Sequence, residues 1–310
     1  MMPIRKQSGF LMDLIKNRSF LIMLLPAIIY LVIFAYLPMT GIILAFKKYT
    51  YTGGIFGSPW NGLRNFVFFF KSGQAFIVTR NTVLYNLLFI SFNTVLQVTV
   101  AILITEVSGR YFKKITQSMM FLPYFISWVV VSVIAFNILS YDVGIINSAV
   151  HSLGGEKVSF YSEQKFWPAI LTLFQAWKGV GYGSIIYLAA IMGIDTEMYE
   201  AARIDGANVF QRIFKITIPQ LKPTIIILFL LAMGGIFRGN FDMFYNIIGS
   251  NGLLYNTTDV IDTFTFRALM TNSDFGMSAA SGLFQSVCCF FTIMIVNKLI
   301  KMYEKDYALF

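Results

Sequence analysis

The stretch DTEMYEAARIDGANVFQRIFKITIPQLKP, residues 195–223, lies between two apolar segments and is itself too polar for the interior of a lipid bilayer. Asp195 and Glu197 place negative charge where it stabilises the N-terminus of a helix. Gly206 follows where a helix commonly ends, because glycine adopts the left-handed conformation at low cost. The first part of the stretch therefore predicts a short helix that ends at a glycine corner.

A second short helix is predicted after this corner. Asn208 has the character of an N-cap, and Gln211 follows three residues later in the relation of a capping box. Its apolar face comprises Phe210, Ile213, Phe214 and Ile216. Pro219 is expected to end this helix, and Pro223 suits the first turn of the next span. Such a pair of helices could be a plain connector between spans or a docking element beneath the membrane.

The composition on either side of this stretch is that of a membrane protein. The 310-residue chain is 57% hydrophobic and 13% charged, whereas about a quarter of the residues of a soluble domain are charged. It contains 32 phenylalanines, 16 tyrosines and four tryptophans, residues that membranes favour at their interfaces. In a soluble protein the net charge of +9 would suggest nucleic acid, but here basic residues flanking apolar spans explain it, and no nucleic-acid partner is expected.

Six segments are candidates for membrane spans, near residues 20–46, 82–105, 115–139, 166–191, 223–237 and 277–300. Pro26 and Pro38 are expected to bend the first span, and Pro123 lies inside the third. The first span is too long for a signal peptide and no small-residue cleavage site follows it, so we expect it to be retained. The predicted fold is an all-α integral membrane protein with six transmembrane helices and a cytoplasmic helix–turn–helix element between the fourth and fifth.

This pattern also predicts the organisation and orientation of the chain. One transmembrane domain, residues 20–302, contains the coupling element 195–222 and is flanked by segments 1–19 and 303–310. Lysine and arginine are more numerous on the side of the two termini, although Lys47 and Lys48 count against this bias. We therefore expect both termini to be cytoplasmic.

A family resemblance begins in the polar stretch. Residues 200–202 read EAA, residues 205–207 read DGA, and Ile216 and Pro219 complete a pattern that resembles the EAA motif of type I ABC importer permeases. Ile218 stands where leucine is commoner in that motif. Because several fixed positions recur over about twenty residues directly after an apolar span, the motif is specific.

The resemblance extends over roughly residues 20–300. Residues 122–130 (LPYFISWVV), 177–190 and 258–263 (TDVIDT) are similar to permeases for complex-carbohydrate uptake, often called the lipoprotein/polysaccharide importer type. This resemblance implies a bacterial cell-membrane subunit that forms half of the translocation path for a complex carbohydrate or oligosaccharide. The implied partners are a second related permease in a heterodimer, two cytoplasmic ABC ATPase subunits and an extracellular substrate-binding lipoprotein.

The resemblance also implies where the ATPase docks. The matching positions are Tyr199, Glu200, Ala201, Ala202, Arg203, Asp205 and Gly206. The carboxylate of Glu200 could pair with a basic group on the ATPase, and the two alanines permit close approach. Gly206 forms the corner.

The chain itself has no recognisable catalytic motif. A P-loop needs a glycine-rich turn that ends in Gly-Lys-Ser/Thr, and no such run occurs. Gly179 and Gly183 lie inside an apolar span, where small residues favour close helix packing. The single histidine and the adjacent Cys288 and Cys289 offer no metal-ligand spacing. We therefore expect a non-enzyme without a cofactor of its own, with ATP and Mg²⁺ bound by the partner ATPase.

Polar groups within the spans indicate where a solute could pass, because such groups are costly in lipid and usually face a bundle interior or cavity. They are Asn93, Gln97, Asn137, Gln175, Lys178 and Gln285. The fifth span is apolar to Phe237 and then reads RGNFDMFYN, directly after Gly234 and Gly235 weaken the helix. An interrupted, polar segment at membrane depth often lines a substrate path.

The predicted substrate path comprises Gln175, Lys178, Arg238, Asn240, Asp242 and Gln285. The same residues could instead have structural roles. Arg238 and Asp242 are four apart and could form a local pair, and Gln175 or Lys178 could bond a neighbouring helix.

Other functions stay open from the sequence. A permease of this type could carry a peptide or a polyamine in place of a sugar. A self-sufficient secondary transporter should show paired broken helices in two internal halves, yet only the fifth span is interrupted. A membrane enzyme would need a catalytic constellation in or near the spans.

Overall fold

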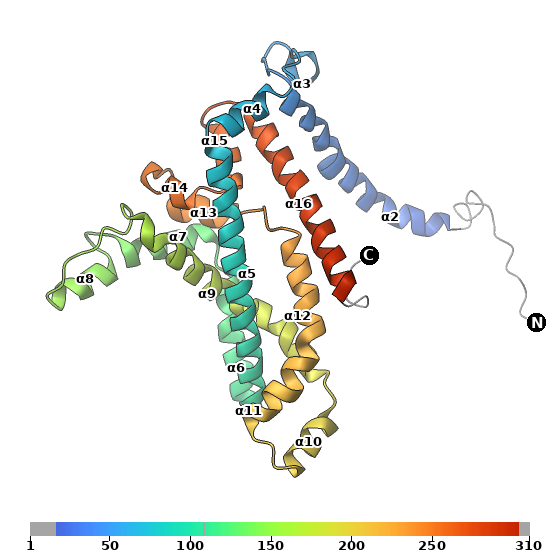
Figure 1. Ribbon diagram of the computed structural model, residues 1–310, viewed down its shortest axis with the longest axis vertical. Coiled ribbons are helices and arrows are strands. Elements are labelled where there is room, and N and C mark those ends of the chain that lie inside the picture. Colours follow the sequence, from blue (N-terminus) through green and yellow to red (C-terminus); the bar gives the residue numbers. More distant parts are fainter. Residues whose placement is uncertain (1–16, 108, 304–310) are drawn as a thin grey trace, which may run out of the picture.

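The computed structural model describes residues 17–107 and 109–303, and this part of the chain is almost entirely helical (Figure 1). An isolated antiparallel bridge between Lys47 and Trp60 is the only β-type pairing among these residues. Most of the predicted N-terminal segment 1–19 and of the tail 303–310 lies outside the described residues.

The prediction of an all-α membrane fold is confirmed. Four helical stretches are long and apolar enough to cross a membrane, namely Arg18–Phe46, Gln74–Glu106, Val209–Met233 and Phe275–Met302. Two further pairs qualify together but are bent, Tyr111–Phe125 with Trp128–Leu139 by 96° and Gln164–Met192 with Thr196–Ile204 by 71°. Counting each bent pair as one span gives the six that the sequence predicts.

The long helices are α2 (Arg18–Leu31), α5 (Gln74–Glu106), α9 (Trp167–Met192), α12 (Ile218–Met233) and α16 (Phe275–Tyr303). The shorter α-helices are α3 (Gly54–Gly57), α4 (Arg64–Lys71), α6 (Arg110–Phe121), α7 (Trp128–Leu139), α8 (Ile145–Ser152), α10 (Thr196–Ile204), α11 (Val209–Arg212), α13 (Phe241–Ile248), α14 (Tyr255–Thr258) and α15 (Ile261–Met270). The π-helical and 3₁₀ segments are η1 (Val32–Tyr36), η2 (Leu37–Phe46), η3 (Leu122–Phe125), η4 (Gln164–Phe166), η5 (Ile213–Thr217) and η6 (Gly252–Leu254).

The parallel pair of α5 and α9 is the centre of the bundle, with Tyr85 and Phe89 near Trp167 at one end and Ile102 near Ile191 at the other. Gly181 on α9 lets α6 approach, since a Cβ there would lie 1.7 Å from the carbonyl oxygen of Met120. A Cβ at Gly183 would lie 2.2 Å from the side chain of Gln97 on α5. The close packing predicted at Gly183 is confirmed, whereas at Gly179 a Cβ would come no closer than 4.0 Å to another residue, and the closest approach is at Gly181.

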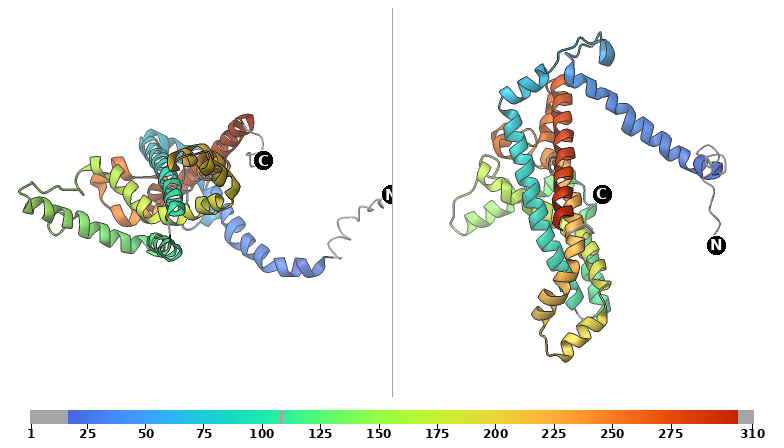
Figure 2. Two further views of the ribbon diagram at one scale, coloured as in Figure 1. Left: turned by 90° about the horizontal axis from the view of Figure 1, so that it is seen from below. Right: turned by 45° about the vertical axis from the view of Figure 1, so that its right-hand side comes forward.

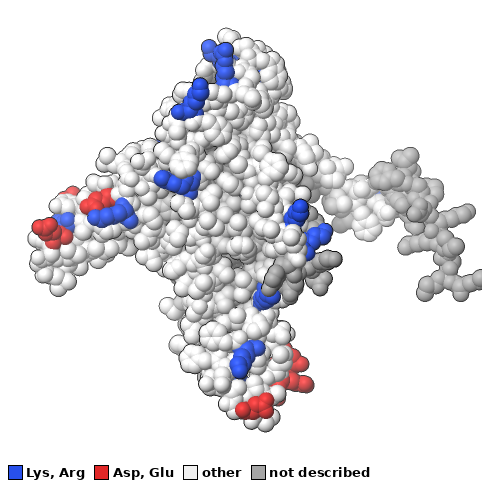
Figure 3. All heavy atoms as spheres, in the orientation of Figure 1, with Lys and Arg blue, Asp and Glu red and all other residues white. Residues whose placement is uncertain are grey.

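The surface agrees with a membrane setting. Lysine, arginine and acidic side chains gather at the ends and tips of the molecule, and a wide uncharged surface lies between them (Figure 3). Large apolar side chains are exposed on the same surface, among them Met23 at 77% and Phe20 at 67% on α2. In water an exposed apolar surface of this extent would drive association, so it is suited to lipid or to partner helices.

The first span leans away from the bundle in every view (Figures 1 and 2). The chain passes Pro26 and Pro38 as one helical stretch. Its hydrogen-bonding pattern changes from π-helical in η1 to 3₁₀ in η2, where Pro38 occupies the first turn. Pro38 is accommodated because the first turn of a helical segment does not need the missing N–H, whereas Pro26 lies inside α2.

The third span, predicted near residues 115–139 with Pro123 inside, consists of two helices with a sharp bend between them. The chain breaks at η3, which contains Pro123, and Ser127 caps the following helix α7 by accepting a hydrogen bond from the Val130 N–H at 3.4 Å. Pro123 cannot donate to the helical ladder. Leu122 keeps helical backbone angles, and the chain leaves helical geometry at Ile126, where ψ is 128°. The result is the 96° bend.

The fifth span differs from the prediction. Pro219 does not end a separate short helix, because α11, η5 and α12 continue as one helical stretch, Val209–Met233. The π-helical turn of η5 ends at Thr217, and Pro219 falls in the first turn of α12, where no donor is needed. The apolar helix ends at Met233, before Phe237, and the helix resumes at α13.

Candidate functional site

The glycine corner lies at the lower tip of the molecule in Figure 1, beyond the ends of α9 and α12. Gly206 has a φ of +78°, and its N–H donates to the Arg203 carbonyl at 3.1 Å. The Ala207 N–H donates to the Ala202 carbonyl at 2.9 Å, which completes a Schellman motif. The predicted end of the first short helix is confirmed.

The helix starts on both sides of the corner are also confirmed. The Asp195 carboxylate accepts a hydrogen bond from the Glu197 N–H at 2.9 Å. Asn208 and Gln211 form a reciprocal capping box, in which each side chain accepts from the other's backbone N–H at 2.8 Å. These bonds are local, so the corner is built almost entirely from its own sequence.

The predicted docking residues present an open face. Glu200, Ala201, Arg203, Asp205 and Gly206 are exposed, and Ala202 is half-buried. The Glu200 carboxylate makes no ion pair with the residues that the structure describes. This face is available for a partner.

Tyr199 lies differently from the rest of the predicted docking set. Its hydroxyl is 2.9 Å from the Thr217 hydroxyl, and Thr217 is buried at the start of α12. On the neighbouring turn Arg212 pairs with Glu106 at the end of α5, with a nitrogen–oxygen distance of 3.8 Å. These two contacts fasten the corner to α12 and α5.

The break in the fifth span is held from outside by α15 and α16. The Gly239 N–H donates to Asp262 Oδ2 at 2.5 Å, and Gln285 Nε2 donates to the same oxygen at 2.9 Å and to the Phe237 carbonyl at 2.8 Å. A Cβ on Gly239 would lie 2.7 Å from Val260 Cγ2, so this position requires glycine. Burial raises the pKa of the Asp262 carboxyl, and its hydrogen bonds act in the opposite direction.

The break opens onto a cavity of about 400 Å³ between α5, α9 and α12. We call it the amide cavity. It is lined by Asn86, Phe89, Ile90, Asn93, Thr94, Gln97, Gln175, Gly183, Ile186, Tyr187, Leu228, Ala232, Arg238, Gly239 and Asn240. A cavity of this size with convergent polar groups is typical of a small-ligand site.

Hydrogen bonds organise the amides of this cavity. Asn86 Nδ2 donates to the carbonyls of Ile236 at 2.8 Å and Arg238 at 2.9 Å, which holds the backbone of the break itself. Asn240 Nδ2 donates to Gln175 Oε1 at 3.2 Å. Asn93 Oδ1 is buried and has no hydrogen-bond partner within the described part of the chain. This oxygen lies close to α9, where a Cβ on Gly179 would be 4.0 Å from it, and is shielded from the cavity.

Three of the six predicted substrate-path residues, Gln175, Arg238 and Asn240, meet in the amide cavity. Asn93 and Gln97, polar residues of the second predicted span, also line it. Asn86 was missed, although a polar residue within an apolar span is the signal that could have identified it.

Lys178 does not line the amide cavity, and its ammonium group is hydrogen-bonded to backbone carbonyls of the third span. Its ammonium donates to the carbonyls of Tyr124 at 2.6 Å and Pro123 at 3.3 Å, and also to that of Ile126. It is 5.5 Å from the centre of the Trp128 ring. Lys178 therefore satisfies the carbonyls that the break in the third span leaves open.

Asp242 and Gln285 do not line the amide cavity either. Asp242 is exposed in the first turn of α13, and it forms no ion pair with Arg238. Gln285 lies behind the break, where it bonds Asp262. Asp262 was not predicted as a site residue, and its sequence signal was the 258–263 stretch of the family resemblance.

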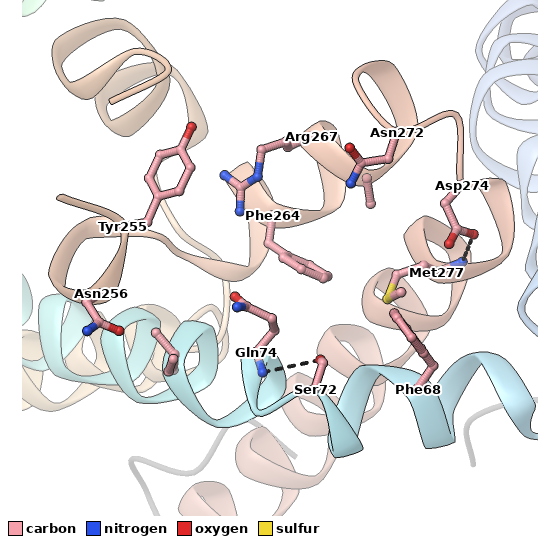
Figure 4. Close-up of a pocket in the computed structure, with 12 residues that line it drawn as sticks. Phe68, Ser72, Gln74, Tyr255, Asn256, Phe264, Arg267, Asn272, Asp274 and Met277 are labelled. Atoms are coloured by element: carbon pink, nitrogen blue, oxygen red, sulfur yellow. Dashed lines mark hydrogen bonds between the residues drawn. The ribbon is translucent and has the colours of Figure 1, made fainter. Parts of the chain in front are cut away.

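A second pocket, of about 370 Å³, lies at the opposite end of the molecule from α10. Figure 4 shows the side chains of Gln74 and Arg267 facing it from α5 and α15. Arg267 forms an ion pair with the buried Asp259 and lies over the Tyr255 ring, 4.2 Å from its centre. No sequence pattern indicated this pocket, because its walls come from separate helices.

Comparison with known proteins agrees with this geometry. Residues 97–303 match the family described as "Binding-protein-dependent transport system inner membrane component". The chain is 32% identical to the polygalacturonan/rhamnogalacturonan transport system permease protein YteP of Bacillus subtilis, over 97% of this chain and 93% of that protein. It is 33% identical to protein LplB of the same organism, over 94% of this chain and 91% of LplB.

Solved structures show the same fold. A chain from a bacterial ABC transporter involved in the import of the acidic polysaccharide alginate superposes with a TM-score of 0.87 at 31% identity, covering 96% of this chain and 100% of that one. A second structure of the bacterial alginate ABC transporter, in complex with an alginate pentasaccharide-bound periplasmic protein, gives 0.86 at 30% identity, with 96% of this chain and 99% of that chain covered. The chain therefore belongs to the family of inner-membrane components of binding-protein-dependent transport systems and is a membrane permease subunit.

Proposed function

We propose that the chain forms half of the translocation path of an ATP-driven importer for a complex carbohydrate or oligosaccharide. The observation that carries this proposal is the amide cavity at the break of the fifth span, with the amide residues Asn93, Gln175 and Asn240 on its walls. Sugar hydroxyls are donors and acceptors, and amide side chains offer both functions. The polysaccharides named for YteP and for the alginate transporter support the same solute class.

The proposed assembly contains a second related permease, two cytoplasmic ABC ATPase subunits that bind ATP and Mg²⁺, and an extracellular binding protein. The open amide cavity supports a second permease half, because one wall of the path is missing in the single chain. The periplasmic protein in the alginate transporter complex supports the binding protein. ATP hydrolysis then belongs to the partners, and this chain is not an enzyme.

The exposed face of α10 is proposed to seat in a groove of an ATPase subunit, with Glu200 and Gly206 at the contact. Closure of the two ATPase subunits would move α10 as a rigid unit. The Tyr199–Thr217 and Arg212–Glu106 contacts would pass this movement to α12 and α5, and both of these helices line the amide cavity.

We also propose that both termini are cytoplasmic in a multi-pass protein of the bacterial cell membrane. The support is geometric. In Figure 1 the described ends of α2 and α16 lie below α3 and α4, toward the half of the molecule that contains α10. A docking role for α10 places that half in the cytoplasm.

The test is ATP-driven uptake of oligosaccharides by the complete complex in proteoliposomes. Glu200→Lys should abolish uptake and stimulated ATPase activity while the two permeases still assemble. Glu197→Lys, a charge reversal on the same helix, is the matched control and should retain most uptake.

Unchanged uptake in Glu200→Lys contradicts the docking role. Uptake of a peptide or a polyamine, with no uptake of any saccharide, contradicts the carbohydrate assignment. Uptake by this chain alone without ATP would instead support a secondary transporter.

A further inference from the structure

The amide cavity carries a single formal charge. Among the residues that line it, the ionisable side chains are those of Arg238 and Tyr187. No carboxylate lines the cavity, so Arg238 carries its only formal charge. Arg238 is exposed and lies in the break between α12 and α13. A cavity lined by one sign of charge concentrates ligands of the opposite sign.

The nearby acids are engaged elsewhere or face away. Asp262 interacts with Arg238 only at long range, because the pair is not within ion-pair distance. Its Oδ2 accepts hydrogen bonds from the Gly239 N–H and Gln285 Nε2. Asp242 is exposed and does not line the cavity. No side-chain hydrogen bond of Arg238 occurs with the residues described, so its guanidinium donors are available.

An arginine beside a membrane-embedded cavity is costly unless an anion compensates it. The guanidinium is planar, stays charged and matches a carboxylate through two parallel hydrogen bonds. The amide residues Gln175, Asn240 and Asn93 line the same cavity. The combination suits a ligand with one carboxylate and several hydroxyls on each unit.

We propose that the amide cavity selects oligosaccharides that contain uronic-acid units, and that Arg238 binds their carboxylates. The amide side chains of Asn93 and Gln175 form hydrogen bonds with the sugar hydroxyls next to the bound carboxylate. This inference rests on the proposed function, because it names the substrate class of the same path. It adds a charge requirement that neutral oligosaccharides do not meet.

The experiment compares trigalacturonic acid with its neutral methyl ester. Equilibrium binding is measured calorimetrically on the purified complex of permeases and ATPases without the binding protein. ATP-driven uptake of the acid is then measured in proteoliposomes with the binding protein present. The variants are Arg238→Gln, Arg238→Lys and, as a control that removes an exposed positive charge outside the cavity, Lys298→Gln.

The expected result is that the wild-type complex binds the acid about 10- to 100-fold more tightly than the ester, the range of a charge-assisted hydrogen bond. Arg238→Gln should remove this preference and lower uptake of the acid by about the same factor. Arg238→Lys should retain part of both, and Lys298→Gln should resemble wild type. Thermal unfolding of each complex separates a loss of binding from a loss of folding.

Equal binding of the two probes, or an unchanged preference in Arg238→Gln, overturns this inference and leaves the proposed function standing. If binding is too weak to measure in detergent, undiminished uptake of the acid by Arg238→Gln overturns it. Failure of every saccharide to enter the vesicles with ATP overturns the proposed function and this inference with it.

Discussion

The corner at Gly206 and the break at Gly239 both depend on a glycine, but for different physical reasons. At Gly206 the backbone is left-handed, with a φ of +78°, and a Cβ would meet nothing within 4 Å. At Gly239 the φ is not positive, yet a Cβ would lie 2.7 Å from Val260 Cγ2 and 3.0 Å from Asp262 Oδ2. The first glycine is required by its own turn and the second by distant parts of the chain.

The two regions therefore differ in whether they contribute to stability or to coupling. The corner is made by bonds between residues a few positions apart and exposes its outer face. The break is held by α15 and α16 and forms one wall of the amide cavity. Substitutions at the break should therefore lower the stability of the permease, and those at the corner should mainly affect its coupling to a partner.

The largest expected effect on stability is at the break. Gly239→Ala should destabilise the permease by roughly 2–3 kcal/mol, because the methyl group overlaps Val260 and the Asp262 carboxylate. The measurement is the thermal unfolding midpoint of the purified complex. Gly252→Ala is the matched control, since a Cβ there meets nothing within 4 Å. Equal midpoints for the two variants would show that the break is not sterically fixed.

Gln285→Leu should cost about 2 kcal/mol, because the Phe237 carbonyl and Asp262 Oδ2 each lose a hydrogen-bond donor. Since the same bonds hold the segment that contains Arg238, uptake should fall with stability. Ser286→Ala is the control, as this exposed hydroxyl donates only to the Gly282 carbonyl within its own helix. A midpoint equal to that of the control would remove Gln285 from the support of the break.

At the corner, Gly206→Ala should cost about 1 kcal/mol, the price of a left-handed conformation in a residue with a Cβ. Gly206→Asn should cost less, because asparagine tolerates this conformation better. Gly193→Ala is the comparison, since Gly193 has a φ of −85°. A loss of several kcal/mol in Gly206→Ala would mean that the corner has tertiary packing that its open surroundings do not show.

The smallest expected effect is in Tyr199→Phe, at about 0.5–1 kcal/mol for the lost hydrogen bond to Thr217. Its effect on coupling should be larger than on stability, since this bond fastens α10 to α12. ATPase stimulation and uptake should fall together. Tyr111→Phe is the control, with Tyr111 84% exposed. Unchanged coupling would place the transmission elsewhere, for example in the Arg212–Glu106 pair.

The sequence predicted the corner well because capping and glycine geometry are local. Asp195, Gly206 and the Asn208–Gln211 box were identified from spacing alone, and the structure confirms each of them. The error there concerned Pro219. The sequence predicts that Pro219 ends the helix, whereas a π-helical turn before it lets the helix continue into the fifth span.

The cavity was only partly predictable, because its residues come from different spans. Gln175 and Asn240 are 65 positions apart, and their hydrogen bond depends on how α9 packs beside the break. Lys178 and Gln285 had the same sequence signal of a polar group in a span, but their partners are backbone carbonyls and Asp262. A polar residue in an apolar segment indicates that a partner exists without saying which one.

By itself, the sequence determined the membrane class, the number of spans and the corner at Gly206, since hydropathy and local turn geometry act over short distances. The tertiary structure decided which polar groups meet in the amide cavity and why Gly239 must be glycine. It also decided that Arg238 faces this cavity without an ion-pair partner in the part of the chain that the structure describes. These outcomes depend on the packing of helices distant in sequence, which no local pattern specifies.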